Sequence, residues 1–158
     1  MEFTLAYDQH KELVWRLVSR YVGSQYDRED LFQEVFLKIS KALPKFRGEA
    51  KIETWIYRVA ANTAINFVKN QQRYSLFRKT LEWMGREKEE EEEDGKVLFE
   101  PLKKLNPRQR MVLVLAEVEE RKLEEIGEML GLPIGTVKSN LHRAKEILRK
   151  ELKDYDKL

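Results

Sequence analysis

The stretch LEEIGEMLGLPIGTVKSNLHRAKEIL, residues 123–148, has the pattern of two helices joined by a tight turn. Ile126 and Leu130 are one helical turn apart, and Gly131 follows them at a position suited to a left-handed helix cap. Pro133 fits the start of a second helix, and Gly127 would let the two helices approach closely. The second helix carries one apolar stripe, formed by Val137, Leu141, Ala144 and Leu148. This pattern predicts a helix-turn-helix.

Small polar and basic residues occupy the opposite face of the second helix. Its centre holds Ser139, His142 and Arg143, and it is flanked by Thr136, Lys138 and Arg149. A protruding helix with this composition suits the major groove of DNA. The alternative is a solvated amphipathic helix, but the glycine turn and the proline start favour DNA binding. His142 has no neighbouring ligand residues, so it is interpreted as a surface or phosphate-contacting residue.

Outside this motif the chain is also expected to be helical, because strand patterns are almost absent and each of its four prolines is expected to bound a helix. Helices are predicted near residues 6–23, 28–43, 52–73, 107–118, 123–130 and 134–152. The expected fold is all-α, with an N-terminal helical bundle (1–74) and a C-terminal helix-turn-helix domain (102–158). Between them, residues 75–101 contain a run of acidic residues and are predicted to form a flexible linker. Within this linker, the segment from Leu76-Phe77 to Trp83-Met84 carries apolar residues that could dock against another surface.

The charge is unevenly distributed along the chain. Residues 1–74 hold 12 basic and 9 acidic residues, residues 75–101 hold 5 and 9, and residues 102–158 hold 13 and 10. Two mildly basic blocks thus flank an acidic connector, although the net charge of the whole chain is only +2.

Two features of the N-terminal half suggest binding surfaces. In the helix predicted at 28–43, Leu37 falls on a polar face beside Asp30, Gln33 and Glu34, which fits a partner-binding helix and a single exposed leucine equally well. In the helix predicted at 52–73, a stripe beside the buried line contains Arg58, Asn62, Ile65, Lys69 and Arg73. Such a stripe could follow phosphates and touch a base, and an ordinary amphipathic helix is the alternative. A short loop with an aromatic residue and a glycine precedes this helix, formed by Phe46, Arg47 and Gly48.

Several classes of protein are excluded by composition. No apolar run approaches the length of about 20 residues that a membrane-spanning helix needs, and the N-terminus lacks the pattern of a secretory signal. The absence of cysteine excludes disulfides and thiolate metal sites. We find no nucleophile–base pair, no metal-spaced histidines and no glycine-rich phosphate loop. We therefore expect a cytoplasmic, non-enzymatic protein with no catalytic residues, no bound metal and no cofactor.

Both halves resemble known sequence regions. DLFQEVF (30–36), FRG (46–48) and TWIYRVAAN (54–62) resemble the second conserved region of extracytoplasmic-function sigma factors. LNPRQR (105–110), Glu125-Ile126 and PIGTVKS (133–139) resemble their fourth conserved region. The order and spacing cover nearly the whole chain except the linker.

The resemblance implies a role for each surface. The helix around Asp30 to Leu37, including Leu31, would dock on core RNA polymerase. The Phe46 loop and the stripe from Arg58 to Arg73 would read the single-stranded −10 element of the promoter, and the helix from Ile134 would read the duplex −35 element. The linker would run near the RNA exit path. Many members of the family are held inactive by an anti-sigma protein, which is a further candidate partner here, and no membrane insertion is expected.

The sequence departs from the family pattern at two positions. Asn140, within the predicted −35 reading helix, stands where a basic residue is common, and Glu120 stands where glycine is common. Asn140 is expected to weaken phosphate contact or to change base preference, and Glu120 is expected to alter the local turn. The main alternative function is a helix-turn-helix transcriptional activator with an unrelated N-terminal regulatory domain, and the motifs of the N-terminal half argue against it.

Overall fold

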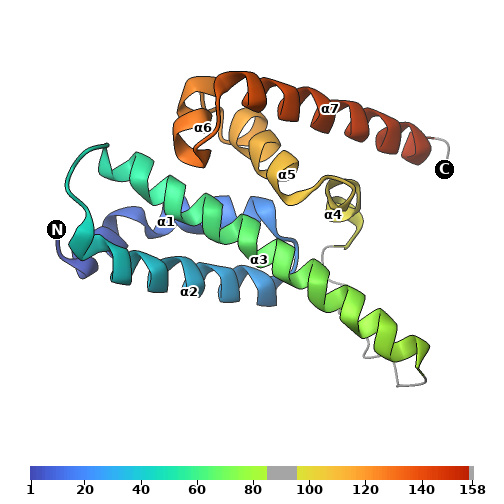
Figure 1. Ribbon diagram of the computed structural model, residues 1–158, viewed down its shortest axis with the longest axis horizontal. Coiled ribbons are helices and arrows are strands. Elements are labelled where there is room, and N and C mark those ends of the chain that lie inside the picture. Colours follow the sequence, from blue (N-terminus) through green and yellow to red (C-terminus); the bar gives the residue numbers. More distant parts are fainter. Residues whose placement is uncertain (85–95, 157–158) are drawn as a thin grey trace.

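The computed structural model describes residues 1–84 and 96–156, and these form helices joined by short turns (Figure 1). The N-terminal half contains α1 (Phe3–Tyr21), α2 (Gln25–Ala42), the short 3₁₀ helix η1 (Leu43–Lys45) and α3 (Ile52–Trp83). The C-terminal half contains α4 (Lys96–Lys103), α5 (Pro107–Leu113), the π-helical turn η2 (Val114–Val118), α6 (Leu123–Leu130) and α7 (Ile134–Asp156). No strand occurs in these two described ranges, so the predicted all-α class is confirmed.

Capping residues determine where α2 and α5 begin. Ser24 precedes α2, and its hydroxyl accepts a hydrogen bond from the Asp27 backbone N–H at 3.1 Å. The helix therefore begins three residues earlier than predicted. Asn106 and Gln109 form a capping box at α5, in which each side chain accepts a hydrogen bond from the other residue's backbone N–H. The Asn106–Gln109 part of the LNPRQR motif therefore marks the beginning of α5.

The segment predicted as a flexible linker differs from expectation where the structure describes it. The chain remains helical in α3 up to Trp83, ten residues beyond the predicted end, and α4 occupies residues 96–103. Pro101 lies inside α4 and does not bound it, so this part of the prediction was wrong. Proline has no backbone N–H, so Pro101 cannot donate one of the few hydrogen bonds available to a helix of 8 residues. The acidic run at 89–94 lies outside the described residues.

The helix-turn-helix is confirmed with the predicted bounds of α6 and the predicted start of α7. Gly131 caps α6 in the left-handed conformation, with φ 66° and ψ 38°. The Leu132 N–H donates to the Gly127 carbonyl oxygen at 2.9 Å, which closes the turn. A Cβ placed on Gly127 would lie 2.8 Å from the Leu132 carbonyl oxygen but 3.8 Å from the Val137 side chain of α7, so the glycine is needed for a close approach to the turn and not to the second helix.

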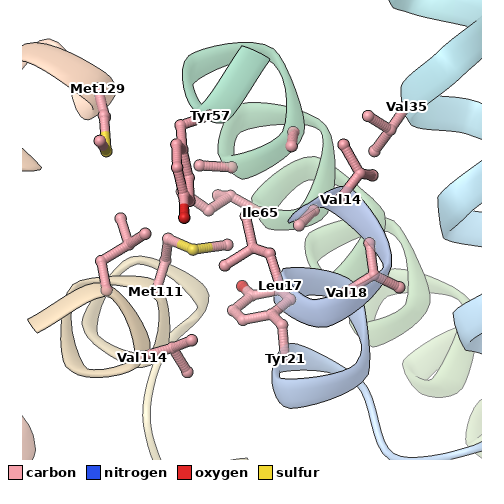
Figure 2. Close-up of a cluster of buried hydrophobic side chains, with 14 of the residues drawn as sticks. Val14, Leu17, Val18, Tyr21, Val35, Tyr57, Ile65, Met111, Val114 and Met129 are labelled. Carbon is pink, nitrogen blue, oxygen red and sulfur yellow. The ribbon is translucent and has the colours of Figure 1, made fainter. Parts of the chain in front are cut away.

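The two halves share one hydrophobic core. Buried residues of α1, α2 and α3 form a single cluster with Met111, Val114, Ile126 and Met129 of the C-terminal half. Figure 2 shows Leu17, Tyr57 and Ile65 facing Met111, with Val114 and Met129 on the same side. A smaller cluster joins α4, α5 and α7 around Leu105, Leu113 and Ala144. In this arrangement the predicted N- and C-terminal domains therefore pack directly against each other.

A polar network crosses the boundary between the halves. The Glu119 carboxylate, only 3% exposed, accepts hydrogen bonds from Arg16 at 3.0 and 3.2 Å and from the Tyr57 hydroxyl at 3.4 Å. Arg121 donates to the Tyr57 hydroxyl at 2.9 Å and to Glu53 at 3.1 Å, and its guanidinium lies 4.5 Å from the centre of the Tyr57 ring. Burial, with Glu119 as a second cause, raises the pKa of Tyr57 above its usual value. We call these five residues the interdomain latch.

Candidate nucleic-acid interface

The outer face of α7 presents the side chains that were predicted to read duplex DNA. Lys138, Ser139, His142 and Arg143 are exposed, whereas Thr136 and Asn140 are partly buried. The Ser139 hydroxyl and the Asn140 amide both donate to the Thr136 carbonyl oxygen, at 3.1 and 2.8 Å. His142 lies 3.1 Å from Glu146, one helical turn further on. The stripe on the inner side is buried at Val137 and Ala144, so the predicted two-faced helix is present.

The stripe on α3 is exposed at four of its five predicted positions. Arg58, Asn62, Lys69 and Arg73 are exposed, and the Asn62 amide donates to the Arg58 carbonyl oxygen at 2.9 Å. Ile65 differs from the other four, because its side chain is only 6% exposed and belongs to the shared core, and its contact with DNA stays a prediction. Figure 2 places Ile65 against Met111 of the C-terminal half. DNA therefore has no access to Ile65 while the halves are packed together.

The loop before α3 combines an anchored ring with an open backbone. Phe46 is half-buried and packs on Trp55, with ring centroids 5.1 Å apart. Arg47 and Gly48 are exposed, and Gly48 has a φ of +75°, a conformation that glycine adopts without strain. A Cβ placed on Gly48 would meet nothing within 4 Å. The loop thus combines an aromatic ring that packs on Trp55 with a glycine that is open to solvent.

The predicted partner-binding face of α2 is largely present. Asp30, Gln33 and Glu34 are exposed, and Leu37 among them is 59% exposed although it is a large apolar residue. Leu31 differs: its side chain is fully buried in the core, so it is not part of the exposed face of α2. The apolar arc of α2 is wide enough to include Leu31, and a partner molecule could not reach it without unfolding the bundle.

Sequence reasoning missed the residues that hold the two halves together. Glu119 and Arg121 stand in a run of charged residues without periodicity, and their partners Arg16 and Tyr57 lie far away in the chain. Arg110 is also missed: it is 7% exposed, and burial lowers its pKa. Its guanidinium lies 5.4 Å from the Tyr21 ring centre. No local sequence signal identifies such pairs, because each of them forms only when the halves meet.

The turn before α6 explains one departure from the family pattern. Glu120 has a φ of +54°, and it is the only residue other than glycine with positive φ in the described ranges. This left-handed conformation favours glycine. The preference for glycine at this position thus has a direct backbone cause, and the present chain makes the same turn with a glutamate.

The described residues contain no group of three or more His, Cys, Asp and Glu side chains that could hold a metal ion. Within the same ranges, no helix has the length and apolar character needed to cross a membrane.

The helix-turn-helix and the second basic face on α3 define a helical protein with two candidate DNA-binding surfaces. The family model for sigma-70 region 2 matches residues 6–74, and that for sigma-70 region 4 matches residues 100–148. The chain is 33% identical over 162 residues to the ECF RNA polymerase sigma factor SigW of Bacillus subtilis, covering 93% of this chain and 87% of the relative. It is 34% identical over 161 residues to the ECF RNA polymerase sigma-E factor of Escherichia coli K12, covering 92% and 84%.

Two solved structures share the fold. The sigma factor RpoE of Bartonella quintana, in complex with the anti-sigma factor NepR, superposes with a TM-score of 0.68 at 19% identity, covering 96% of each chain. CnrH, in complex with the cytosolic domain of CnrY, gives 0.67 at 20% identity, covering 96% of this chain and 88% of that one. The chain belongs to the extracytoplasmic-function sigma factors of RNA polymerase, which bind the core enzyme and direct it to promoters. The match of residues 6–74 to sigma region 2 excludes the alternative with an unrelated N-terminal domain.

Proposed function

We propose that the exposed faces described above divide the work of a sigma factor as follows. The polar face of α2 around Leu37 docks on core RNA polymerase. The Phe46 loop and the exposed residues of the α3 stripe bind the melted −10 strand, and the outer face of α7 reads the duplex −35 element. Residues 1–74 and 102–158 act as the two DNA-binding domains, and residues 75–101 connect them.

One observation carries this proposal: basic and amide side chains are exposed together on two helices of different halves. On α3 they are Arg58, Asn62, Lys69 and Arg73, and on α7 they are Lys138 and Arg143. Backbone phosphates attract such cations, and amides and guanidinium groups can pair with base edges. A protein with one such face would bind one DNA element. This chain has two such faces, one for the −10 element and one for the −35 element.

The first test concerns the melted strand. A base that leaves the stack must recover a few kcal/mol of lost stacking, and the Phe46 ring together with the Asn62 amide could supply it. We expect Asn62→Ala to abolish −10 base preference both on an ordinary promoter and on a template with a pre-melted −10 bubble. Transcription by the reconstituted holoenzyme on −10 variants measures this. Normal core binding is the control, and unchanged preference on the bubble template would show that Asn62 does not read the strand.

The second test concerns the polymerase. Leu37 is 59% exposed on a helix whose core residues lie on the other side. Leu37→Asp is therefore expected to weaken core binding by more than about 1 kcal/mol, as the loss of an interface anchor does, while the helical circular dichroism remains normal. Titration of labelled core enzyme measures the affinity. Leu76→Asp, which changes another exposed leucine, is the matched control. Equal affinity of Leu37→Asp and the native protein would rule out docking through this face.

The third test concerns the −35 element. Arg143 can pair with guanine in the major groove, which is worth about 1–3 kcal/mol of discrimination, so Arg143→Ala should relax preference at one −35 position. Lys138→Ala should instead weaken binding to all promoters similarly and flatten the salt dependence. Holoenzyme affinity for a set of −35 variants distinguishes the two. Uniform weakening by both substitutions would make Arg143 a phosphate contact.

The remaining assignments follow from the same function. RNA synthesis belongs to the polymerase, so this chain selects the site and catalyses nothing itself. Its working place is the bacterial cytoplasm, where the core enzyme and the promoter are. An anti-sigma protein is a further expected partner, and support comes from the fold shared with RpoE of Bartonella quintana, which was solved in complex with the anti-sigma factor NepR.

A further inference from the structure

Asn140 is unlike the basic side chains around it on α7. It is neutral and partly buried, whereas Lys138 and Arg143 are charged and exposed, and it stands where a basic residue is common in the family. Asparagine is also a poorer helix former than lysine or arginine, so helix stability does not explain its place early in α7. Figure 1 shows α7 on the side of the molecule away from α1 and α2.

The amide group of Asn140 is held by its own helix. Its nitrogen donates a hydrogen bond to the Thr136 carbonyl oxygen at 2.8 Å, one helical turn earlier. A carbonyl oxygen can only accept, so the nitrogen and not the oxygen of the amide must face Thr136. This contact fixes the rotation of the amide before any ligand binds, which lowers the entropy that binding costs.

The hydrogen bond to Thr136 leaves Asn140 with one donor and one acceptor. An asparagine amide has two N–H groups and a carbonyl oxygen, and Thr136 occupies only one N–H. In the part of the chain that the structure describes, no hydrogen bond engages the second N–H or the oxygen. Ser139 differs, because its hydroxyl donates its only proton to the same Thr136 oxygen at 3.1 Å. Asn140 therefore keeps a donor and an acceptor, whereas Ser139 keeps only an acceptor.

Adenine is the base whose edge matches this pair of groups. In the major groove it presents the donor N6–H and the acceptor N7, which an amide can bind at the same time. Guanine presents two acceptors, cytosine presents a donor alone, and thymine presents an acceptor beside a methyl group. Each of these bases would leave one group of the amide without a partner, and an unpaired polar group at an interface weakens binding.

We propose that Asn140 is a specificity-determining residue that reads one adenine of the −35 element. The inference rests on the −35 role proposed for α7. Arg143, the proposed guanine reader, lies three residues further on, and side chains at this spacing are neighbours about 5–6 Å apart. Successive bases of one strand are about 3.4 Å apart. The adenine is therefore expected within about two base pairs of the position that Arg143 reads.

The experiment changes single groups of the DNA and measures the affinity of holoenzyme formed from core polymerase and the full chain. A panel of −35 variants first locates the position at which Asn140→Ala changes base preference. There the native protein should prefer adenine about tenfold, or about 1.4 kcal/mol. Replacing this adenine with 7-deazaadenine, which lacks the N7 acceptor, or with a purine that lacks the amino group should remove most of the preference. Holoenzyme with Asn140→Ala should bind all three templates equally.

Two further variants are the controls. Ser139→Ala removes the other side chain bonded to Thr136 and should keep the native response to both base analogues. Asn140→Arg should lose that response, bind all −35 variants more tightly and steepen the slope of log affinity against log salt by about 0.9, because it adds a phosphate contact. Uniform weakening of all −35 variants by Asn140→Ala would overturn the proposal. So would a native holoenzyme that responds to neither analogue at any adenine of the element, a result that requires no variant to fold.

Arg143→Ala and Lys138→Ala on the same panel separate this outcome from a failure of the −35 assignment. If neither substitution changes binding to any −35 variant, α7 does not read the element and the proposed function is wrong. If Arg143→Ala relaxes preference at one position while Asn140→Ala leaves every preference unchanged, the −35 assignment stands and the adenine contact is wrong.

Discussion

Replacing Glu119 and Arg121 together with alanine is expected to separate the two halves of the free protein. The Glu119 carboxylate is 3% exposed and is bound by Arg16, and Arg121 links Tyr57 to Glu53. Hydrogen bonds to charged groups are worth about 1.5–3 kcal/mol each, and the Arg16 side chain is 44% exposed, so solvent screens part of this energy. We expect the packed arrangement to lose about 3 kcal/mol, which is more than a hundredfold in the equilibrium between packed and separated halves.

Small-angle scattering of the free protein measures this directly as an increase in radius of gyration. Helical circular dichroism should be unchanged, because neither residue contributes a side chain to a buried helix face. Glu125→Ala is the matched control: Glu125 is 3.8 Å from Arg121, but both residues belong to the C-terminal half. A scattering curve identical to that of the native protein would mean that the apolar core alone holds the halves together.

The separation matters for the candidate site because the packed arrangement restricts part of it. Ile65 is buried against the C-terminal half, and a Cβ on Gly131 would lie 3.9 Å from the Arg58 guanidinium. The end of α6 is thus next to the first residue of the α3 stripe. A DNA strand bound along the stripe from Arg58 to Arg73 would therefore meet the end of α6 near Arg58 while the two halves are packed together.

The helix-turn-helix could be predicted almost completely from sequence, because its signals are local. The apolar spacing in α6 and α7 and the glycine between them depend on residues within one turn of each other, and Gly131 has the predicted left-handed conformation. The end of α3 could not be placed in this way, since the prediction followed the apolar stripe, which fades after Arg73. The absence of any glycine or proline between Gly48 and Gly85 was the better signal for the longer helix.

Two predicted site residues, Leu31 and Ile65, are buried in the structure, and they illustrate why exposure at an interface is hard to predict from sequence. Leu31 lies at the edge of a wide apolar arc, and periodicity does not separate the last core residue from the first surface residue. Ile65 lies on a face that looks exposed when α3 is considered by itself, but another part of the chain covers it. The interdomain latch could not be predicted from sequence either, because Arg16 and Glu119 are 103 residues apart. Long-range contacts of this kind leave no periodic trace in a single sequence.

Gly127→Ala is expected to destabilise the helix-turn-helix and with it the binding of the −35 element. Alanine is normally favoured over glycine within a helix by up to about 1 kcal/mol. Here the added Cβ would lie 2.8 Å from the Leu132 carbonyl oxygen, which belongs to the backbone of the turn and cannot rotate away. Overpacking of this kind costs about 1–3 kcal/mol, and we expect the upper part of that range, because a shift of Leu132 also disturbs its hydrogen bond to Gly127.

Thermal denaturation followed by circular dichroism measures the loss, and Gly135→Ala is the matched control. Gly135 lies in the first turn of α7, and a Cβ there would meet nothing within 4 Å. The same chemical change should therefore leave the melting temperature unchanged or raise it slightly, through the helix preference of alanine and the smaller entropy of the unfolded chain. A lower melting temperature for Gly127→Ala alone would identify the close approach of α6 to the turn as the cause. Equal melting temperatures for the two variants would show that the turn can relax around a methyl group, and the two helices would then not depend on glycine for their packing.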